Sequence, residues 1–536
     1  MSIIDARTLA SGTELETDVC VIGAGAAGVT VAQELAAAGR RVCLVESGGF
    51  EPDPETQSLY DLDSVGYPQR PNFMSRARYF GGSCNLWAGR SMALAPLDVA
   101  DRPWVPGGAW PIPFEEIEQF YPRAATVLGL PARTGLSEAE LGSYLSDDER
   151  RLLDSPDILP TVSLWARRAR RFGPVEGRKL GAGPGATVVI SASVTELMTS
   201  EAGDRVAAAR IRTLGGNDGF IRAGRFVVAC GGLETARLLL ASRDRHPDGI
   251  GNGHDLVGRF FMDHPRAVHG KVHLQPRSRL RGLRGRPTPD GKLQVGLGFS
   301  PDLQRREGLL NHYVTLEMQT SGYTEARYQS FVQTMKVLLR RGHSGSRFDF
   351  AKRHLGQLPE MIYLLSPKEL MPHPLYRLYV ALRDAVPRRP APQTFVAVYF
   401  CEQPPMAASR VTLGAERDAL GTPRLVLDWQ IDEAVYRSID RLQGLLARRL
   451  EEAGLGRLEP GSGRPSFTDA SHHMGTTRMG RDARDGVVDP HCRVHGMSNL
   501  YVASSAVFPS AGHANPTWTI VALALRLAEH LKAAPR

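Results

Sequence analysis

Two short segments near the C-terminus hold residues suited to proton transfer. The first has the sequence HHMGTTRMG at residues 472–480, and the second, roughly forty residues later, has the sequence GHANPT at residues 512–517. An imidazole with a pKa near neutrality can accept the proton of an alcohol. A nearby amide can hold the substrate oxygen by a hydrogen bond without competing for that proton. This chemistry becomes an oxidation only if a redox cofactor lies beside these segments.

A glycine-rich turn near the N-terminus predicts such a cofactor. The sequence GAGAAG at residues 23–28 follows an apolar run and precedes an expected helix from Val29 to Ala38. Its three glycines permit a tight turn, close approach of backbone N–H groups to a pyrophosphate, and close packing of helix on strand. The next expected strand, 41–46, ends at Glu46, whose carboxylate suits a ribose 2′-hydroxyl. A glycine-rich turn without a ligand is the alternative.

Two further blocks resemble parts of one nucleotide-binding domain. Residues 225–232 read as a strand that enters a glycine pair and a helix, and residues 499–505 read as a strand that ends at small residues. A long helix is expected from Pro516 to Lys532. The pieces therefore lie at the start, middle and end of the chain, and Pro- and Gly-rich stretches at 101–113 and 273–290 mark the expected crossings to a second domain.

Composition sets broad limits on the protein class. The chain is 42% hydrophobic and 23% charged, which is ordinary for a globular protein, and its formal net charge of +8 says little about partners. Six cysteines lack CxxC spacing, which favours buried free thiols in a reducing compartment. Residues 1–16 lack an apolar signal core and no run of 18 apolar residues occurs, so we expect a soluble cytoplasmic protein.

The order of these motifs resembles that of the glucose-methanol-choline (GMC) oxidoreductases, flavoproteins that oxidise alcohols with FAD. The resemblance covers residues 17–98, 186–268 and 460–534. It rests on the glycine turn ending in Glu46, YFGGSCNLW at 79–87, ACGGLE at 229–234, GRFFMDHP at 258–265 and the C-terminal pair of segments. The forms HxxGTxRMG and ANPT most resemble the branch of pyranose oxidases and sugar dehydrogenases.

The resemblance implies an α/β fold with two domains. A discontinuous Rossmann-like FAD-binding domain is expected at 1–98, 186–268 and 460–536. An α+β substrate domain, with a sheet over the flavin, is expected at 99–185 and 269–459. The implied activity is oxidation of a primary or secondary alcohol on a sugar, glycoside, aminoglycoside or cyclitol, with proton abstraction and hydride transfer to flavin N5.

The resemblance also assigns the site residues. It places the catalytic base at His472 and its partner at Asn515, with His513 and His264 as candidate pocket residues. We expect His473 to be structural, and a metal site formed by the histidines is disfavoured because no Cys or carboxylate stands at a supporting spacing. The residues assigned to FAD binding are Gly23, Gly25, Ala26, Ala27, Gly28, Glu46, Ser47, Gly81, Gly82, Ser83, Asn85, Leu86, Trp87, Ala88, Val194, Ala229, Gly231, Ser504, Ser505, Asn515, Pro516 and Thr517.

Two departures from the pyranose oxidases bear on the cofactor. Those enzymes attach FAD covalently to a histidine just before a tryptophan, where this chain has Leu86 before Trp87. We therefore expect non-covalent FAD. The hydroxyl-bearing residue that follows that tryptophan is replaced by Ala88. This loss favours a dehydrogenase with an unknown electron acceptor over an oxidase.

The segment 326–389 is strongly basic, with twelve Arg or Lys against four acids. A helical lid or insertion with a solvated basic face is the simpler interpretation, and a membrane-surface or protein-docking patch is the alternative. Nucleic acid is not expected, because no binding motif accompanies the charge.

Rival functions on the same fold are a flavin monooxygenase or amine oxidase, which would not require His472 and Asn515, and a non-catalytic FAD-fold binding protein. The intact glycines of the turn argue against the binding protein.

Overall fold

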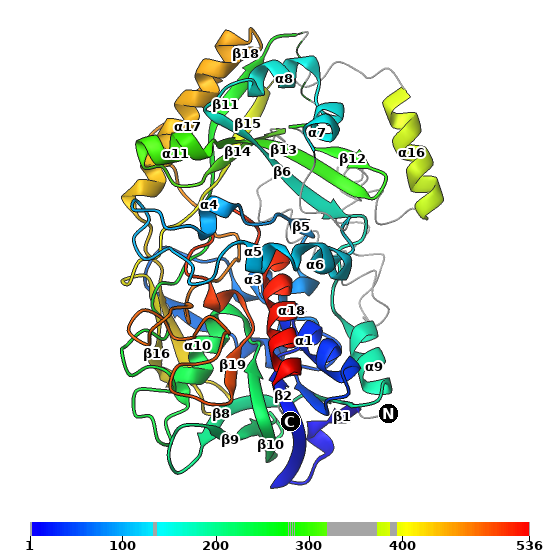
Figure 1. Ribbon diagram of the computed structural model, residues 1–536, viewed down its shortest axis with the longest axis vertical. Helices are drawn as coiled ribbons and strands as arrows, with labels where there is room; N and C mark the ends of the chain where they lie inside the picture. Colours follow the sequence, from blue (N-terminus) through cyan, green and yellow to red (C-terminus); the bar gives the residue numbers. More distant parts are fainter. Residues whose placement is uncertain are drawn as a thin grey trace, which may run out of the picture.

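The computed structural model describes residues 3–131, 137–318 (apart from 277, 279, 281 and 284), 372–385 and 394–534. Two eight-stranded sheets lie toward opposite ends of an elongated molecule, one low and one high in Figure 1, and segments with little regular structure run between them. A smaller third sheet has three strands.

The first sheet is mostly parallel and has β2 near its centre. The last four residues of β2 are buried, and Val21 pairs with Leu44 on one side and with Val227 on the other. In spatial order the strands are β1 (Ile3–Asp5), β7 (Ala186–Ile190), β3 (Val42–Val45), β2 (Thr13–Ile22), β10 (Asp218–Val228), β9 (Val206–Arg212) and β8 (Ser193–Thr199), with β19 (Leu500–Val502) paired to β10. Strands from all three predicted blocks therefore share one sheet, which confirms the α/β fold class.

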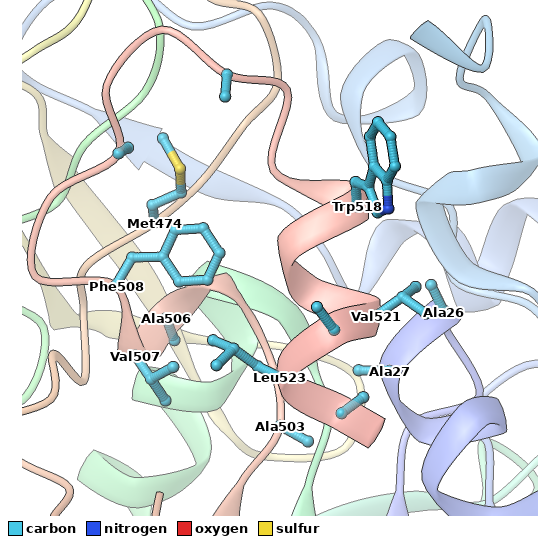
Figure 2. Close-up of a cluster of buried hydrophobic side chains, with 14 of the residues drawn as sticks. Ala26, Ala27, Met474, Ala503, Ala506, Val507, Phe508, Trp518, Val521 and Leu523 are labelled. Carbon is cyan, nitrogen blue, oxygen red and sulfur yellow. The ribbon is translucent and has the colours of Figure 1, made fainter. Parts of the chain in front are cut away.

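Helix α1 (Ala26–Ala37) joins β2 to β3 and begins three residues earlier than predicted. Its small first residues explain the earlier start, because a helix can approach a strand closely where side chains are small. The C-terminal helix α18 (Thr517–Ala533) packs against it. Figure 2 shows this contact, where Val521 of α18 lies in the same buried cluster as Ala26 and Ala27. The predicted C-terminal helix thus lies beside the helix that follows the glycine turn.

The second sheet covers the other end of the molecule. In order it contains β18 (Gly456–Glu459), β11 (Arg266–Leu274), β15 (Thr394–Phe400), β14 (Tyr313–Met318), β13 (Gly291–Phe299), β6 (Ile158–Ala166) and β5 (Arg90–Ser91), with β12 (Arg286–Thr288) paired to β13. Helix α17 (Glu433–Glu452) lies along it with buried Val435, Ile439, Leu442 and Leu446 at helical spacing. The third sheet contains β16 (Arg410–Arg417), β17 (Pro423–Asp428) and β4 (Leu62–Ser64).

The other helices are short, apart from α10 and α16. They are η1 (Ala6–Thr8), α2 (Pro54–Ser58), α3 (Asn72–Ser75), η2 (Gly82–Asn85), α4 (Pro96–Val99), α5 (Glu115–Glu118), α6 (Tyr121–Leu128), α7 (Glu138–Tyr144), α8 (Asp147–Leu153), α9 (Pro174–Ala182), α10 (Gly231–Ala241), α11 (Pro301–Glu307), α16 (His373–Ala385) and η4 (Ser505–Val507). Within the described ranges, no helix combines the length and apolar character needed to span a bilayer. All six cysteines are free, and five of them are buried. Most of the basic segment 326–389 lies outside the described residues.

Candidate active site

The predicted dinucleotide turn forms an open cradle at the N-terminus of α1. A Cβ on Gly28 would lie 1.9 Å from the Gly23 carbonyl oxygen, and one on Gly23 would lie 2.7 Å from that of Ala229, so both positions require glycine. At Gly25, the residue that precedes α1, a Cβ would meet nothing within 4 Å, and no side chain caps the helix. The space before this helix end is therefore free, and the helix N-terminus favours an anion there.

Glu46 lies beside this turn and is buried. One of its carboxylate oxygens accepts a hydrogen bond from Ala24 N at 2.8 Å, and the other accepts one from Gly48 N at 3.0 Å. Burial raises the pKa of Glu46, and these two N–H groups oppose that effect. Glu46 thus braces the glycine turn, a role that its motif did not predict. Each carboxylate oxygen keeps a second lone pair with which it can bind a ribose hydroxyl.

The segment 79–87 lies against the same turn. Gly81 N donates to the Ala24 carbonyl at 2.9 Å, and a Cβ on Gly82 would lie 3.1 Å from Gly25 Cα. The Asn85 amide nitrogen donates to two carbonyls of this segment, but its oxygen is buried without a partner among the described residues. An open cradle with an unsatisfied acceptor beside it fits a large polar cofactor such as FAD.

The other residues assigned to FAD approach this edge of the first sheet. Ala229 N bonds to the Ile22 carbonyl at 2.8 Å, and Ala503 N, just before the two assigned serines, bonds to the Val228 carbonyl at 2.9 Å. The hydroxyls of Ser47 and Ser193 are 2.5 Å apart, which places Val194 near the end of β3. Leu86, Trp87 and Ala88 follow η2, and Pro516 and Thr517 begin α18.

The two predicted catalytic residues are in contact. The side-chain nitrogen of Asn515 lies 3.3 Å from His472 Nε2, and His264 Nδ1 lies 2.9 Å from His472 Nδ1. The rings of His264 and His472 meet edge to face with centroids 5.1 Å apart. His472 is half-buried, and His264 is buried. His264 is one of the candidate pocket residues, but no local sequence pattern links it to His472.

The hydrogen bonds define one arrangement of protons. The Asn515 amide nitrogen can only donate, so His472 Nε2 is the acceptor and the His472 proton is on Nδ1. That proton is then donated to His264 Nδ1, and the His264 proton is on Nε2. Burial lowers the pKa of His264 to about 3 and lowers the pKa of His472 well below its ordinary value, with His264, His473, Arg90 and Arg70 adding to the effect on His472. Both rings are therefore neutral, and His472 Nε2 keeps a basic lone pair.

A buried carboxylate fixes the backbone around this base. Asp263 accepts hydrogen bonds from the backbone N–H groups of His264, Ala470 and His472, at 2.6 to 3.1 Å. Ser471, directly before His472, has a φ of 60°, which is the left-handed region that few non-glycine residues adopt. His473 turns elsewhere, toward Gln69 at 3.2 Å, and burial lowers its pKa to about 3.

His513 is held by residues that the sequence analysis did not identify. Its Nδ1 donates to the Asn311 carbonyl at 3.0 Å, so its Nε2 is an acceptor. The Asn311 side chain donates to Asp98 at 2.6 Å, and a Cβ on Gly512 would lie 2.4 Å from the Asp98 carboxyl carbon. Asn311 N also donates to Glu402 at 2.7 Å.

Glu402 in turn is paired with Arg102 at 2.5 Å, and neither of these two side chains is exposed. This buried network positions the loop that carries Asn515. Asp98 and Glu402 are buried between segments that are distant in sequence, so no local sequence pattern predicts their burial.

A glycine turn open to an anion, together with a neutral, half-buried imidazole, suits a flavin-dependent oxidoreductase. Residues 18–57 match the family model of FAD dependent oxidoreductases, and residues 405–524 match that of GMC oxidoreductases. The C-terminal part of this chain is thus a GMC oxidoreductase domain, which confirms the resemblance drawn from the motifs. Within the described residues, no group of three or more His, Cys, Asp or Glu side chains could hold a metal ion.

Whole-length relatives agree with this class. The fructose dehydrogenase large subunit of Gluconobacter japonicus is 24% identical over 97% of this chain and 98% of its own length. Paromamine 6′-oxidase of Streptomyces fradiae is 26% identical over 96% of this chain and 90% of its own length.

Solved structures show the same fold. Pyridoxine 4-oxidase from Mesorbium loti has a TM-score of 0.53 at 18% identity and covers 97% of this chain and 100% of its own. An R554A variant of Aspergillus oryzae formate oxidase has a TM-score of 0.56 at 17% identity and covers 98% of this chain and 99% of its own.

Proposed function

We propose that the protein uses non-covalent FAD to oxidise a primary or secondary alcohol of a sugar, glycoside, aminoglycoside or cyclitol. The observation that carries this proposal is the neutral His472, whose Nε2 faces Asn515 at 3.3 Å and whose Nδ1 meets His264 at 2.9 Å. Relatives named for oxidation of fructose and paromamine support the substrate class.

His472, Asn515 and His264 have different roles in the proposed alcohol oxidation. His472 Nε2 accepts the hydroxyl proton, and the Asn515 amide donates a hydrogen bond to the substrate oxygen. FAD, when bound, supplies the acceptor for the hydride that leaves the carbinol carbon. Asn515 directly precedes Pro516 and the N-terminus of α18, whose partial positive charge favours negative charge nearby. His264 accepts the Nδ1 proton of His472, so Nε2 carries a lone pair and not a proton. A bound substrate hydroxyl takes the place of the Asn515 amide at that lone pair.

Anaerobic mixing with a panel of sugars, polyols and glycosides tests the proposal. We expect at least one alcohol to bleach the visible absorbance of the flavin. The proposal fails if dithionite bleaches the flavin and no alcohol does. Ala88, which lacks a hydroxyl, supports a dehydrogenase, so turnover with a quinone dye should exceed turnover with dioxygen.

Acid precipitation tests how the cofactor is held. Leu86 offers no nucleophile at the position before Trp87, so we expect precipitation with acid to release all of the FAD into the supernatant. Absorbance of the supernatant and pellet measures this release. Yellow colour that stays with the pellet would show a covalent bond to another residue.

Substitutions of His264 test its effect on the base. His264→Leu removes the acceptor for His472 Nδ1–H and should slow anaerobic flavin reduction roughly 10- to 100-fold, as loss of an orienting partner commonly does. Asn places an oxygen near the position of Nδ1, whereas Gln places one near Nε2, so His264→Asn should keep most of the rate and His264→Gln should not.

The pH profile of flavin reduction is the second readout for His264. A base is active when it is deprotonated, and the lowered pKa of His472 keeps it neutral as the pH falls. The wild-type rate constant should therefore stay level from about pH 8 down to about 6.5, the pH at which an ordinary histidine is already half protonated. If the rate of flavin reduction falls equally in the Asn and Gln variants, His264 acts only through packing and does not orient His472.

A further inference from the structure

Arg90 presents a positive charge with no carboxylate in contact among the described residues. The charge of Glu317 acts on it, but Glu317 is itself paired with Arg266 at 3.4 Å. Its guanidinium lies 4.3 Å from the ring centroid of Phe400, 4.9 Å from that of Trp165 and 5.6 Å from that of Tyr313. Nε donates to the Ser163 hydroxyl at 3.0 Å, and the contact of Nη2 with Gln294 is long, at 3.5 Å. Within the described part of the chain it forms no ion pair with a carboxylate.

Two buried arginines elsewhere in the molecule are each paired with a carboxylate. Arg102 is paired with Glu402 at 2.5 Å, and Arg237 is paired with Asp418 at 2.8 Å. A guanidinium has five N–H donors, so three of those on Arg90 are left without a partner in the described residues. Arg90 is half-buried among these rings. Removing a cation from water without an anion in contact is costly, and aromatic faces offset only part of that cost.

Arg90 is also close to the reacting groups. The Tyr313 ring stacks on Phe400 with centroids 4.9 Å apart and meets His513 at 4.6 Å, so the aromatic wall beside Arg90 continues to the loop that carries Asn515. The charge of Arg90 contributes to the lowered pKa of both His472 and His513. The Tyr313 hydroxyl is buried and interacts with Ser163, the residue that also accepts from Arg90 Nε.

We infer that the site beside His472 takes an alcohol that carries a carboxylate, and that Arg90 binds this carboxylate. The inference rests on the proposed function and narrows its substrate class, because the same charge repels cationic aminoglycosides. A planar guanidinium with unused N–H groups suits a carboxylate, which it can bind through two parallel charge-assisted hydrogen bonds. The substrate class therefore becomes sugar acids, uronides and related hydroxy acids.

Three matched glycosides test the inference by anaerobic flavin reduction. They are methyl glucuronide, methyl glucoside and methyl 6-amino-6-deoxyglucoside, which share their secondary hydroxyls and differ in the group at carbon 6: a carboxylate, a neutral hydroxymethyl and an ammonium-bearing methylene. In the wild type, the glucuronide should show the largest reduction rate constant divided by dissociation constant, and the amine the smallest. Arg90→Met should lower this ratio roughly 10- to 100-fold for the glucuronide, the size of effect expected for a charge-assisted pair, and much less for the glucoside.

Control variants separate the effect of the positive charge from that of the planar guanidinium group. Arg90→Lys keeps the charge and should recover part of the loss. Lys292→Met removes another cation that lies 4.8 Å from the Trp165 ring and should leave the order of the three substrates unchanged. Equal losses for glucuronide and glucoside in Arg90→Met, or a wild type that prefers the amine, would overturn the inference while leaving alcohol oxidation intact.

A ligand that cannot be oxidised separates this inference from the proposed function. Cyclohexanecarboxylate has no hydroxyl group, and we expect it to perturb the visible spectrum of the bound flavin saturably in the wild type and at least 10-fold more weakly in Arg90→Met, as loss of a charge-assisted pair implies. If the carboxylate binds in this way and no alcohol reduces the flavin, the proposed function is wrong and the anion site stands. If it binds both proteins alike, the anion site is wrong.

Discussion

Replacing His472 by alanine should slow anaerobic flavin reduction by alcohol roughly 10²–10⁴-fold, the usual contribution of a positioned base. The loss arises because Nε2 of His472 carries the lone pair that takes the hydroxyl proton. FAD should stay bound, since the glycine turn and Glu46 lie at the other end of the site. Stopped-flow absorbance measures the rate, and the ratio of flavin to protein absorbance measures the occupancy.

Asn515 and His513 provide the controls for this experiment. Asn515→Ala should cost less than His472→Ala, because it removes a hydrogen bond to the substrate oxygen and not the proton acceptor. His513→Ala should also cost less, since among the described residues Asn515 contacts the ring of His472, whereas the His513 ring is bound to the Asn311 carbonyl and packs against Tyr313. A larger loss at His513 than at His472, with flavin retained in both variants, would move the base into the loop 512–516.

Gly25→Val should leave a folded protein that holds FAD poorly. A Cβ at this position meets no protein atom within 4 Å, so we expect the apoprotein to keep its thermal stability. The same side chain would enter the space that we assign to the pyrophosphate, and overpacking of this kind costs about 1–3 kcal/mol, or roughly 5- to 150-fold in affinity. Apoprotein titrated with FAD, followed by flavin fluorescence, gives the dissociation constant.

Gly444→Ala is the matched control for Gly25. Gly444 lies within α17, and a Cβ there also meets nothing within 4 Å, so this variant should bind FAD as the wild type does. Gly25→Ala should fall between Gly25→Val and the wild type. Unchanged FAD affinity in Gly25→Val would show that the cofactor does not approach the N-terminus of α1.

The sequence predicted the elements whose pattern is local. The turn at Gly23 to Gly28 and its flanking strand and helix were predictable because glycine spacing and apolar runs act over a few residues. The predicted site pair, His472 and Asn515, could be assigned because each residue lies in a short motif that resembles one of the GMC oxidoreductases. The structure places these residues in contact, and their roles stay predictions.

Long-range contacts were not predictable from one sequence. His264 and His472 are separated by 208 positions, and no periodic pattern links them. Asp98 and Arg102 appeared ordinary in sequence, yet both are almost fully buried in the network that positions His513. The role that we infer for Arg90 likewise depends on the structure, in which β5 places it among three aromatic rings.

The most direct measurement of the central claim is the stoichiometry of a single anaerobic turnover. The purified protein is mixed with an excess of an alcohol that bleaches its flavin, and the carbonyl product is quantified against the flavin that has been reduced. Alcohol oxidation through bound FAD predicts one aldehyde or ketone for each flavin reduced, and a rate of bleaching that collapses in His472→Ala. Bleaching without a carbonyl product, or at an unchanged rate in His472→Ala, would contradict the mechanism.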